Sequence, residues 1–464
     1  MATTLECFAQ ELEGFDPVSV FSAVHERPYA LFLDSADRNH KNARYSFVMC
    51  DPVEVLTPAQ DGNFFDALQK RLTAFSANTV EGLPPFQGGA AGYFGYDLGR
   101  QLETLPSLAK DNPAMPDAVI SIYDQVFAHD HLTGQSWLIT HATDETTAKA
   151  RQKKFLRLVE SAQPVPVFRG ADLPWESNFD SFDYQDQVRK VIEYIRAGDI
   201  FQANLSQRFD AALPSGFSPF SHYLKLRSAN PAPFAAYMNA GDIKISSASP
   251  ERFLTVRERQ VETRPIKGTR PRSGNAAMEE LYKQELRDSV KDRAENTMIV
   301  DLLRNDLSRV CTPESVEVAG LCELESFARV HHLVSTVRGK LQGGKTPIDL
   351  LRACFPGGSI TGAPKIRSME IIEELEPTRR GPYCGAMGYI GFDGSMDTSI
   401  LIRTLVYQGG NVSFQVGGGI VADSDADAEY EETFHKAEAI FHSFEGSIST
   451  ECFEDDEREI CRVG

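Results

Sequence analysis

The sequence lacks most of what membrane and nucleic-acid-binding proteins need. Its apolar runs, such as 298–300 and 400–402, are far shorter than the roughly 20 residues of a membrane helix, so no membrane span is expected. Positive charge is also scarce, since the chain has 47 Lys and Arg against 66 Asp and Glu, which gives a net charge of −19. This balance excludes nucleic acid as an expected partner, because phosphates need a basic surface. A small anionic substrate would have to be held by local cations or backbone N–H groups.

Cysteine clusters and a secretory signal are missing as well. The 8 cysteines are scattered without a Cys-x-x-Cys pair, so we expect neither a disulfide framework nor a zinc site. The first residues lack the basic start and apolar centre of a secretory signal, and a cytoplasmic location is therefore expected.

The apolar pattern changes along the chain and predicts an α+β fold. Short apolar segments alternate with turns in the first third, whereas longer amphipathic helices and strand pairs follow a proline-containing linker at 162–178. We expect an N-terminal subdomain at 1–165, a catalytic domain at 180–448 and a disordered acidic tail at 449–464. The expected helices include 147–161, 183–197, 278–290, 294–307, 364–375 and 428–444, and the expected strands include 243–247, 252–257, 260–264, 386–392, 399–407 and 411–416.

Carboxylates on two of these helices are candidates for binding a cation. Glu295 shares the apolar face of helix 294–307, and either a metal or a salt bridge to Arg293 or Arg304 would satisfy it. Glu429 and Glu432 lie three residues apart on helix 428–444. Two such carboxylates suit Mg²⁺, although spacing alone favours an exposed acidic stripe paired with Lys436.

Two further segments combine flexible backbone with charge. Gly417, Gly418 and Gly419 follow a predicted strand and could form an anion-binding nest, or simply a bulge or tight turn. Lys267 lies in a predicted stiff turn among Arg264, Arg270 and Arg272. Neighbouring cations would depress the pKa of Lys267 and make it a nucleophile, whereas the alternative is a solvated loop lysine.

Taken together, the ordered segments resemble the chorismate-utilising enzymes, a family that includes anthranilate synthase component I, the aminodeoxychorismate synthases, and the isochorismate and salicylate synthases. The resemblance spans about 185–445 and is looser in the N-terminal region. It rests on GDIFQANLSQR (198–208), ASPERF (248–253), PIKGT (265–269), DRAEN (292–296), FPGGSITGAPK (355–365), DTSILIRT (397–404) and the stretch 417–436.

The resemblance implies a fold and a branch of the family. It implies an α+β fold like that of anthranilate synthase component I, with a large two-sheet β-sandwich core and helices packed outside. Anthranilate synthases usually carry alanine where this chain has Lys267, and the isochorismate and salicylate synthases carry a lysine base where it has Gln202. The chain is therefore most similar to the aminodeoxychorismate branch, which makes 4-amino-4-deoxychorismate for para-aminobenzoate and folate. The alternatives are an anthranilate synthase large subunit and a catalytically silent chorismate- or tryptophan-binding regulator.

The resemblance also implies a role for each site residue. Lys267 would form a covalent adduct with chorismate, and Glu251 would transfer protons. Glu295 and Glu432 would hold Mg²⁺ with Glu429 close by, and the metal would take the ring carboxylate. The remaining substrate-binding residues would be Gln202, Gly268, Thr269, His332, Tyr383, Arg403, Gly417, Gly418 and Gly419, of which His332 could equally be a core histidine.

Two expectations concern other ligands and partners. No segment resembles a glutaminase, so ammonia would come from a separate glutamine amidotransferase subunit in a heterodimer. The N-terminal region resembles the one that holds a tryptophan pocket in anthranilate synthases, and that pocket would lie near Ser35, Pro233, Phe234 and Ala235.

Overall fold

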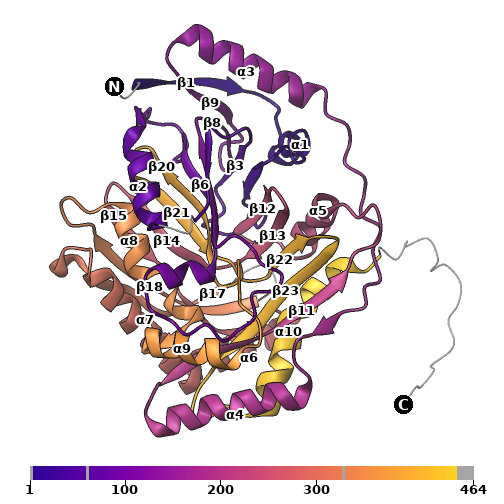
Figure 1. Ribbon diagram of the computed structural model, residues 1–464, viewed down its shortest axis with the longest axis vertical. Helices are drawn as coiled ribbons and strands as arrows, with labels where there is room; N and C mark the ends of the chain where they lie inside the picture. The colour runs from indigo at the N-terminus through magenta and orange to yellow at the C-terminus, as the bar shows by residue number, and fades with distance from the viewer. Residues whose placement is uncertain (1–3, 59–61, 327–329, 447–464) are drawn as a thin grey trace, which may run out of the picture.

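Two large β-sheets face each other at the centre of the molecule (Figure 1). The computed structural model describes residues 4–58, 62–326 and 330–446, and within these ranges the sheets contain 13 and 10 strands. The predicted tail at 449–464 lies outside the described residues. In the described part of the chain, no helix is long and apolar enough to cross a membrane.

The first sheet is antiparallel apart from the short β1–β5 pairing. Its strands in spatial order are β10 (Glu176–Ser177), β11 (Gln202–Ala212), β23 (Asn411–Ile420), β22 (Thr404–Gln408), β13 (Ile243–Ser249), β12 (Phe234–Ala240), β2 (Leu31–Asp34), β3 (Tyr45–Met49), β8 (Gln125–Asp130), β9 (Ser136–Ala142), β1 (Thr4–Leu12) and β5 (Ser76–Ala77), with β19 (Gly362–Ala363) beside β11.

The second sheet is antiparallel and likewise draws on both halves of the sequence. Its strands in spatial order are β16 (Ile266–Pro271), β18 (Val330–Lys340), β15 (Gln260–Thr263), β14 (Arg252–Arg257), β21 (Met396–Ile400), β20 (Ala386–Gly391), β6 (Gly89–Phe94), β7 (Ala118–Tyr123) and β4 (Glu54–Leu56), with β17 (Glu317–Ser326) beside β18. Strands from 1–165 thus supply one end of each sheet, and strands from residue 176 onward supply the other.

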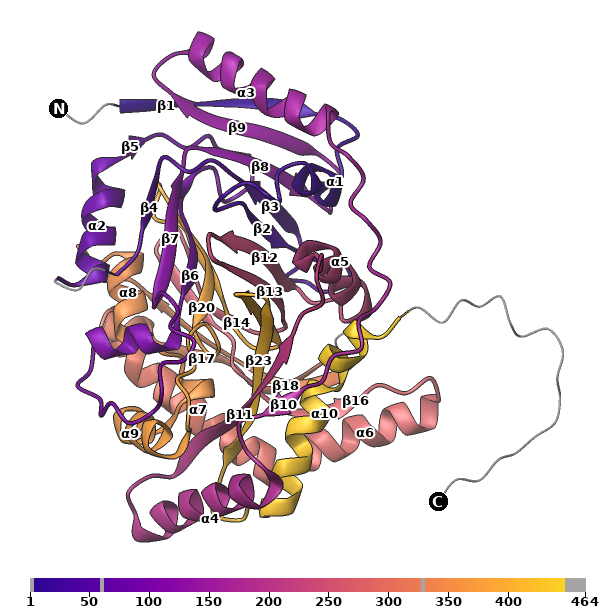
Figure 2. The ribbon, with the colours of Figure 1, turned by 45° about the vertical axis from the view of Figure 1, so that its right-hand side comes forward.

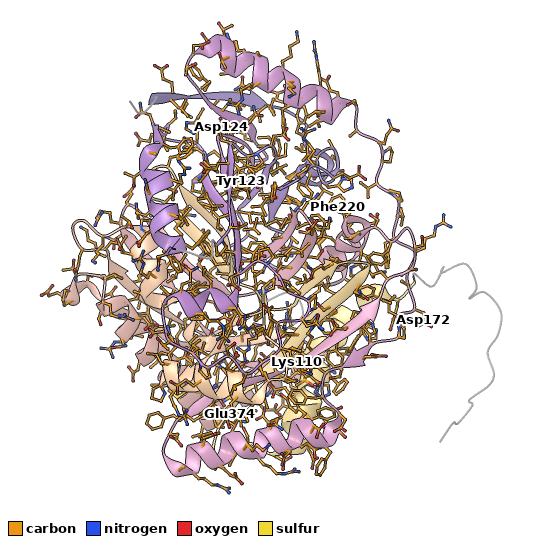
Figure 3. All side chains as sticks on the ribbon, viewed as in Figure 1. Lys110, Tyr123, Asp124, Asp172, Phe220 and Glu374 are labelled. Atoms are coloured by element: carbon orange, nitrogen blue, oxygen red, sulfur yellow. The ribbon has the colours of Figure 1, made fainter. Side chains whose placement is uncertain are left out.

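Large apolar side chains from both sheets fill the space between them. Phe47 of the first sheet packs edge to face against Tyr389 of the second, with ring centroids 5.6 Å apart. Other aromatic side chains, including Tyr123 and Phe220, are fully buried within the fold (Figure 3). Burial of apolar surface, to which these aromatic side chains add, is the main favourable contribution to folding.

Helices cover the outside of the sandwich, with α3 near one end and α4 at the other in both views (Figure 1, Figure 2). Local capping sets several helix boundaries: Gly198 adopts a left-handed conformation (φ 84°) that ends α4, and the Asp425 side chain accepts a hydrogen bond from the Ala428 N–H at the start of α10. The helices are α1 (Pro17–Ser22), α2 (Phe64–Ala74), α3 (Glu145–Glu160), α4 (Ser181–Ala197), α5 (Pro219–Ala229), α6 (Ala276–Asp288), α7 (Val290–Ser308), α8 (Pro347–Cys354), α9 (Lys365–Leu375) and α10 (Ala426–Phe444).

The predicted α+β sandwich with external helices is confirmed, whereas the single strand at 399–407 is wrong. The chain leaves the second sheet after β21, crosses through Leu401–Arg403 and enters the first sheet as β22. Arg403 has φ 52°, a left-handed conformation that is uncommon outside glycine. The sequence has no glycine or proline at this crossing, so its uninterrupted apolar pattern resembled one strand.

Candidate active site

A β-bulge in β16 sets the position of Lys267. The pairing of β16 with β18 shifts register between Lys267 and Thr269, and Gly268 between them has φ 79°. A Cβ at Gly268 would also lie 2.9 Å from the Asp292 side chain, so only glycine fits there. Lys267 reaches β23, where a Cβ added to Gly419 would lie 3.2 Å from the Lys267 Nζ.

The surroundings of Lys267 differ from the predicted turn among cations, and that prediction is wrong. Lys267 lies in a strand, and the charged groups that face it are the carboxylates of Glu251, Glu295 and Glu432. Each nearby arginine forms an ion pair of its own: Arg264 with Glu325, Arg270 with Asp292 (3.6 Å) and Arg272 with Glu279 (3.1 Å). An amine among carboxylates can exchange protons with them.

Glu251 is a buried acid beside Lys267. It lies between β13 and β14, is 5% exposed, and accepts a 2.7 Å hydrogen bond from the Ser359 hydroxyl. Burial raises the pKa of Glu251 to about 7, although the Ser359 hydroxyl and the Lys267 charge act in the opposite direction. A carboxyl group with this pKa both donates and accepts protons near neutrality. Ser359 belongs to the FPGGSITGAPK motif, but no sequence pattern indicated this contact.

Three carboxylates converge from α7 and α10. Glu429 is 5% exposed and accepts a 2.6 Å hydrogen bond from Ser424, whereas Glu432 is half-exposed and lies 2.6 Å from Lys436. A Cβ added to Gly418 would lie 3.2 Å from Glu429 Oε2 and 3.5 Å from Glu432 Oε1. The acidic stripe paired with Lys436 is therefore present at Glu432 but not at the buried Glu429.

Lys291 shows that Glu295 shares this neighbourhood. Burial disfavours the charged form of Lys291, but the carboxylates of Glu429, Glu295 and Glu432 outweigh it and raise its pKa. The Lys291 Nζ lies 3.4 Å from Glu429 Oε1. The predicted alternative for Glu295, a salt bridge to Arg293 or Arg304, does not form among the described residues, and sequence patterns did not indicate Lys291.

These carboxylates fit Mg²⁺ in its usual protein setting. Across residues 4–446, apart from the short masked gaps, no group of three His, Cys, Asp or Glu side chains is arranged to hold a metal by itself. Mg²⁺, however, takes one or two carboxylates and completes its shell with water and substrate oxygens. Glu295 and Glu432, with Glu429 close by, supply hard oxygen donors of that kind.

Arg403 is a half-buried cation, and no acidic partner for it lies among the described residues. It follows β21 at the crossing between the sheets, and burial lowers the pKa of its guanidinium. Among the described residues no side chain forms a hydrogen bond or ion pair with Arg403. A desolvated guanidinium of this kind is suited to bind a carboxylate, because its planar fork matches two oxygens.

His332 and Tyr383 are both buried. The His332 Nδ1 lies 2.9 Å from the Thr269 hydroxyl and 3.3 Å from the Gly268 carbonyl oxygen. Burial, followed by the Arg403 charge, lowers the pKa of His332 to about 3, so its imidazole is neutral. Tyr383 is 6% exposed and packs against the Arg380 guanidinium, 5.8 Å from the ring centroid.

The three glycines at 417–419 lie in a regular strand, so the predicted bulge or tight turn is wrong, whereas anion binding by their N–H groups stays a prediction. They are regular residues of β23, which pairs with β11 without a register shift from Ile420 to Asn411. Because successive strand residues face opposite sides, Gly418 faces the α10 carboxylates and Gly419 faces Gln202 and Lys267. Glycine is required at 418 and 419 because a Cβ there would occupy the space that these side chains fill. At Gly417 a Cβ would lie 2.2 Å from the Leu205 carbonyl oxygen.

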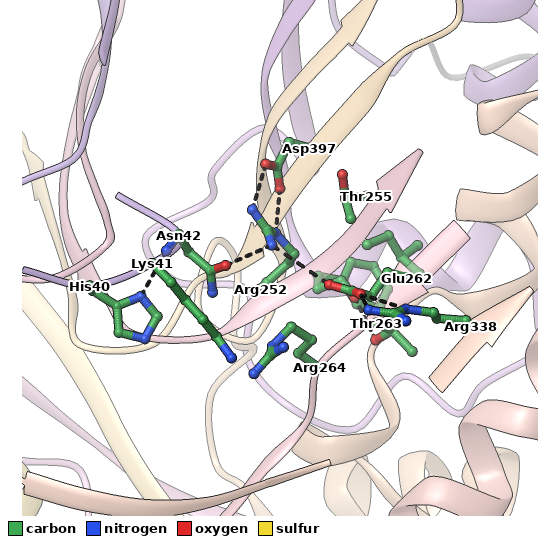
Figure 4. A network of polar contacts seen from close by, with 12 residues as sticks. His40, Lys41, Asn42, Arg252, Thr255, Glu262, Thr263, Arg264, Arg338 and Asp397 are labelled. Carbon is green, nitrogen blue, oxygen red and sulfur yellow. Dashed lines mark hydrogen bonds and ion pairs between the residues drawn. The ribbon is translucent and has the colours of Figure 1, made fainter. Parts of the chain in front are cut away.

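A separate cavity of about 690 Å³ lies between the sheets and is lined by Ser35, Pro233, Phe234 and Ala235, the four residues expected near a tryptophan pocket. Arg252 lies over the Phe234 ring at 5.2 Å and joins a polar network with Asp397, Asn42 and Glu262 (Figure 4). The Ser35 hydroxyl donates a 2.6 Å hydrogen bond to the Tyr45 carbonyl oxygen. Binding of tryptophan in this cavity stays a prediction.

The comparisons with known proteins agree with this geometry. Residues 28–442 match the family described as chorismate binding enzyme. The chain is 42% identical to aminodeoxychorismate synthase component 1 of Salmonella typhimurium over 440 residues, which cover 92% of this chain and 95% of the relative. It is 40% identical to anthranilate synthase component 1 of Thermus thermophilus over 451 residues, covering 94% and 96%.

A solved structure shares the fold. Anthranilate synthase component I from Streptococcus pneumoniae superimposes with a TM-score of 0.77 at 32% identity, covering 86% of this chain and 92% of the other. The expected anthranilate synthase component I-like sandwich is thus confirmed. With the family model matching most of its length, the chain belongs to the chorismate-binding enzymes.

Proposed function

We propose that this enzyme aminates chorismate at C4 to give 4-amino-4-deoxychorismate, the precursor of para-aminobenzoate. The observation that carries the proposal is that the Lys267 amine lies close enough to the buried Glu251 carboxyl for its charge to act on that group. A nucleophile and a proton-transfer group side by side are what a covalent amination route needs. Relatives named aminodeoxychorismate synthase component 1, at 42% and 41% identity, support the same activity.

Substrate binding requires compensation of the two carboxylates of chorismate. Arg403, which has no acidic partner among the described residues, would bind the enolpyruvyl carboxylate, with Tyr383 nearby. Gly268 and Thr269 would line the ring side. Mg²⁺ held by Glu295 and Glu432 would neutralise the ring carboxylate. The strand glycines would let the ring approach the backbone closely.

The chemistry would proceed in two substitutions. The Lys267 nitrogen forms a bond to C2 while both ring double bonds shift, and the C4–O bond breaks with its electron pair on oxygen. Glu251 protonates this oxygen, which leaves as water, and the resulting carboxylate takes a proton from the lysine nitrogen. Ammonia then donates its lone pair to C4, both double bonds shift back, the C2–N bond breaks with its electrons on the lysine nitrogen, and a proton passes from the new ammonium group to Lys267. One hard substitution becomes two easier ones.

Anthranilate synthesis is the second candidate. It is favoured by relatives such as the Thermus thermophilus protein, named anthranilate synthase component 1, at 40% identity. The Lys267 amine in the site supports C4 amination instead. A catalytically silent regulator is disfavoured because Lys267, Glu251 and the three carboxylates lie together.

The metal proposal predicts the effect of removing one ligand charge. Glu295→Gln keeps the side-chain size but offers a neutral, weaker ligand, so kcat/KM should fall by roughly 100-fold or more, as expected for losing charge stabilisation of several kcal/mol. Glu432→Gln should behave similarly. The matched control is Glu431→Gln, an exposed neighbour on α10 that should retain activity. Full turnover by Glu295→Gln, or by the wild type in excess chelator, would contradict the Mg²⁺ role.

The partner proposal predicts which nitrogen source the isolated chain uses. Because no segment resembles a glutaminase, purified chain should aminate chorismate with ammonium salts and not with glutamine. Adding a glutamine amidotransferase subunit should confer glutamine use, measured as aminated product by mass spectrometry. Amination with glutamine by the chain alone would refute the need for a partner.

A further inference from the structure

Two buried side-chain oxygens on β11 have no hydrogen-bond partner. Gln202 and Asn204 are 1% and 8% exposed, and among the described residues nothing hydrogen-bonds to Gln202 Oε1 or Asn204 Oδ1. Leaving a buried acceptor unpaired costs about 1–3 kcal/mol. The backbone groups of Asn204 are already hydrogen-bonded, because its N–H donates to the Thr361 carbonyl at 2.7 Å and Arg380 donates to its carbonyl at 2.7 Å. The two unpaired side-chain oxygens therefore lie on a strand whose backbone is held in place by hydrogen bonds.

Gln202 lies beside the reacting lysine, and Asn204 lies on the same face of the strand. Gln202 and Asn204 are two residues apart and share one face of β11. Asn204 pairs directly with Gly419 of β23, and paired residues in an antiparallel ladder place their side chains on the same face. On that face a Cβ at Gly419 would lie 1.9 Å from the Gln202 Nε2 and 3.2 Å from the Lys267 Nζ.

The chemistry of the pair selects a ligand that donates hydrogen bonds. An amide carbonyl oxygen accepts hydrogen bonds but cannot donate them, and it repels other oxygen atoms. The carboxylates of chorismate are therefore poor partners for these two oxygens. Ammonia has three N–H groups and one lone pair. If two N–H groups are donated to the two oxygens, the lone pair stays available for a carbon atom.

We propose that Gln202 Oε1 and Asn204 Oδ1 together bind ammonia and direct its lone pair toward the substrate ring beside Lys267. This inference rests on the proposed amination. It assigns Asn204 to the site and gives the Gln202 carbonyl a specific ligand.

The test uses Asn204→Leu, which removes the acceptor at similar size, and Asn204→Asp, which retains an acceptor oxygen. For Asn204→Leu the KM for ammonium should rise roughly tenfold, the effect of about one hydrogen bond. The KM for chorismate should not change, and the Lys267 adduct should form normally without ammonium, as seen by intact-protein mass spectrometry. Asn204→Asp should restore part of the ammonium affinity.

Other outcomes are equally informative. A raised KM for chorismate with an unchanged KM for ammonium would overturn the inference and assign the oxygens to the substrate hydroxyl. If Asn204→Leu does not fold, Gln202→Met, which likewise lacks the acceptor, should show the same selective rise, and its absence would overturn the inference. A wild-type chain that gives neither adduct nor aminated product would refute the proposed function instead, so the two failures are distinguishable.

Discussion

Lys267→Ala should abolish the covalent adduct and reduce kcat for amination by roughly a thousandfold or more, as for loss of a nucleophile in other covalent mechanisms. The lysine lies on β16 beside the Gly268 bulge, which aims its amine past Gly419. Alanine fits the same strand without strain, so the variant should fold and still bind chorismate. The measurement is intact-protein mass spectrometry after incubation with chorismate and Mg²⁺, together with steady-state rates.

Lys190→Ala is the control for this variant. Lys190 is an exposed lysine of α4 that pairs with Asp186, and its loss should change neither the adduct nor the rate. A Lys267→Ala protein that still formed an adduct would place the nucleophile elsewhere. Normal amination without any adduct in the wild type would rule out the covalent route.

Glu251→Gln should lower kcat by roughly 10²–10⁴-fold, the usual contribution of a proton-transfer group. Glutamine preserves the size of the side chain and its contact with Ser359, but it cannot donate a proton to the leaving hydroxyl. Because burial raises the pKa of Glu251 to about 7, the carboxyl is protonated below that pH and loses its proton above it. At saturating free ammonia, the wild-type kcat should therefore fall as the pH rises through about 7.

The pH profile tests this assignment separately from folding. Glu251→Gln should lose the alkaline fall in rate. Ser359→Ala removes a hydroxyl that stabilises the ionised carboxylate, so it should raise the pKa of Glu251 and move the fall to higher pH. An unchanged fall near pH 7 in Glu251→Gln would show that another group supplies the proton.

Much of the secondary structure could be predicted because apolar periodicity is local. The strand at 252–257 has the predicted bounds, and the helix predicted at 428–444 begins two residues earlier, at Ala426, where Asp425 caps it. The crossing at 401–403 could not be predicted, because a change of sheet depends on distant strands rather than on local pattern.

The site was only partly predictable for the same reason. Motif residues such as Lys267 and Glu251 could be identified as candidates, yet the ion pairs of the neighbouring arginines depend on distant residues such as Glu325. Likewise, spacing could not show that Glu429 is buried while Glu432 is half-exposed. Lys291 carries no periodic signal at all, and only its ion pair with Glu429 of α10 reveals its role.

The fate of the enolpyruvyl group tests the central claim most directly. Wild-type chain should be incubated with chorismate, Mg²⁺ and an ammonium salt, and the products identified by mass spectrometry without any added lyase. Because Lys267 holds C2 while C4 is aminated, the product should be 4-amino-4-deoxychorismate with its side chain intact, and no pyruvate should be released. Accumulation of anthranilate together with pyruvate would contradict the account.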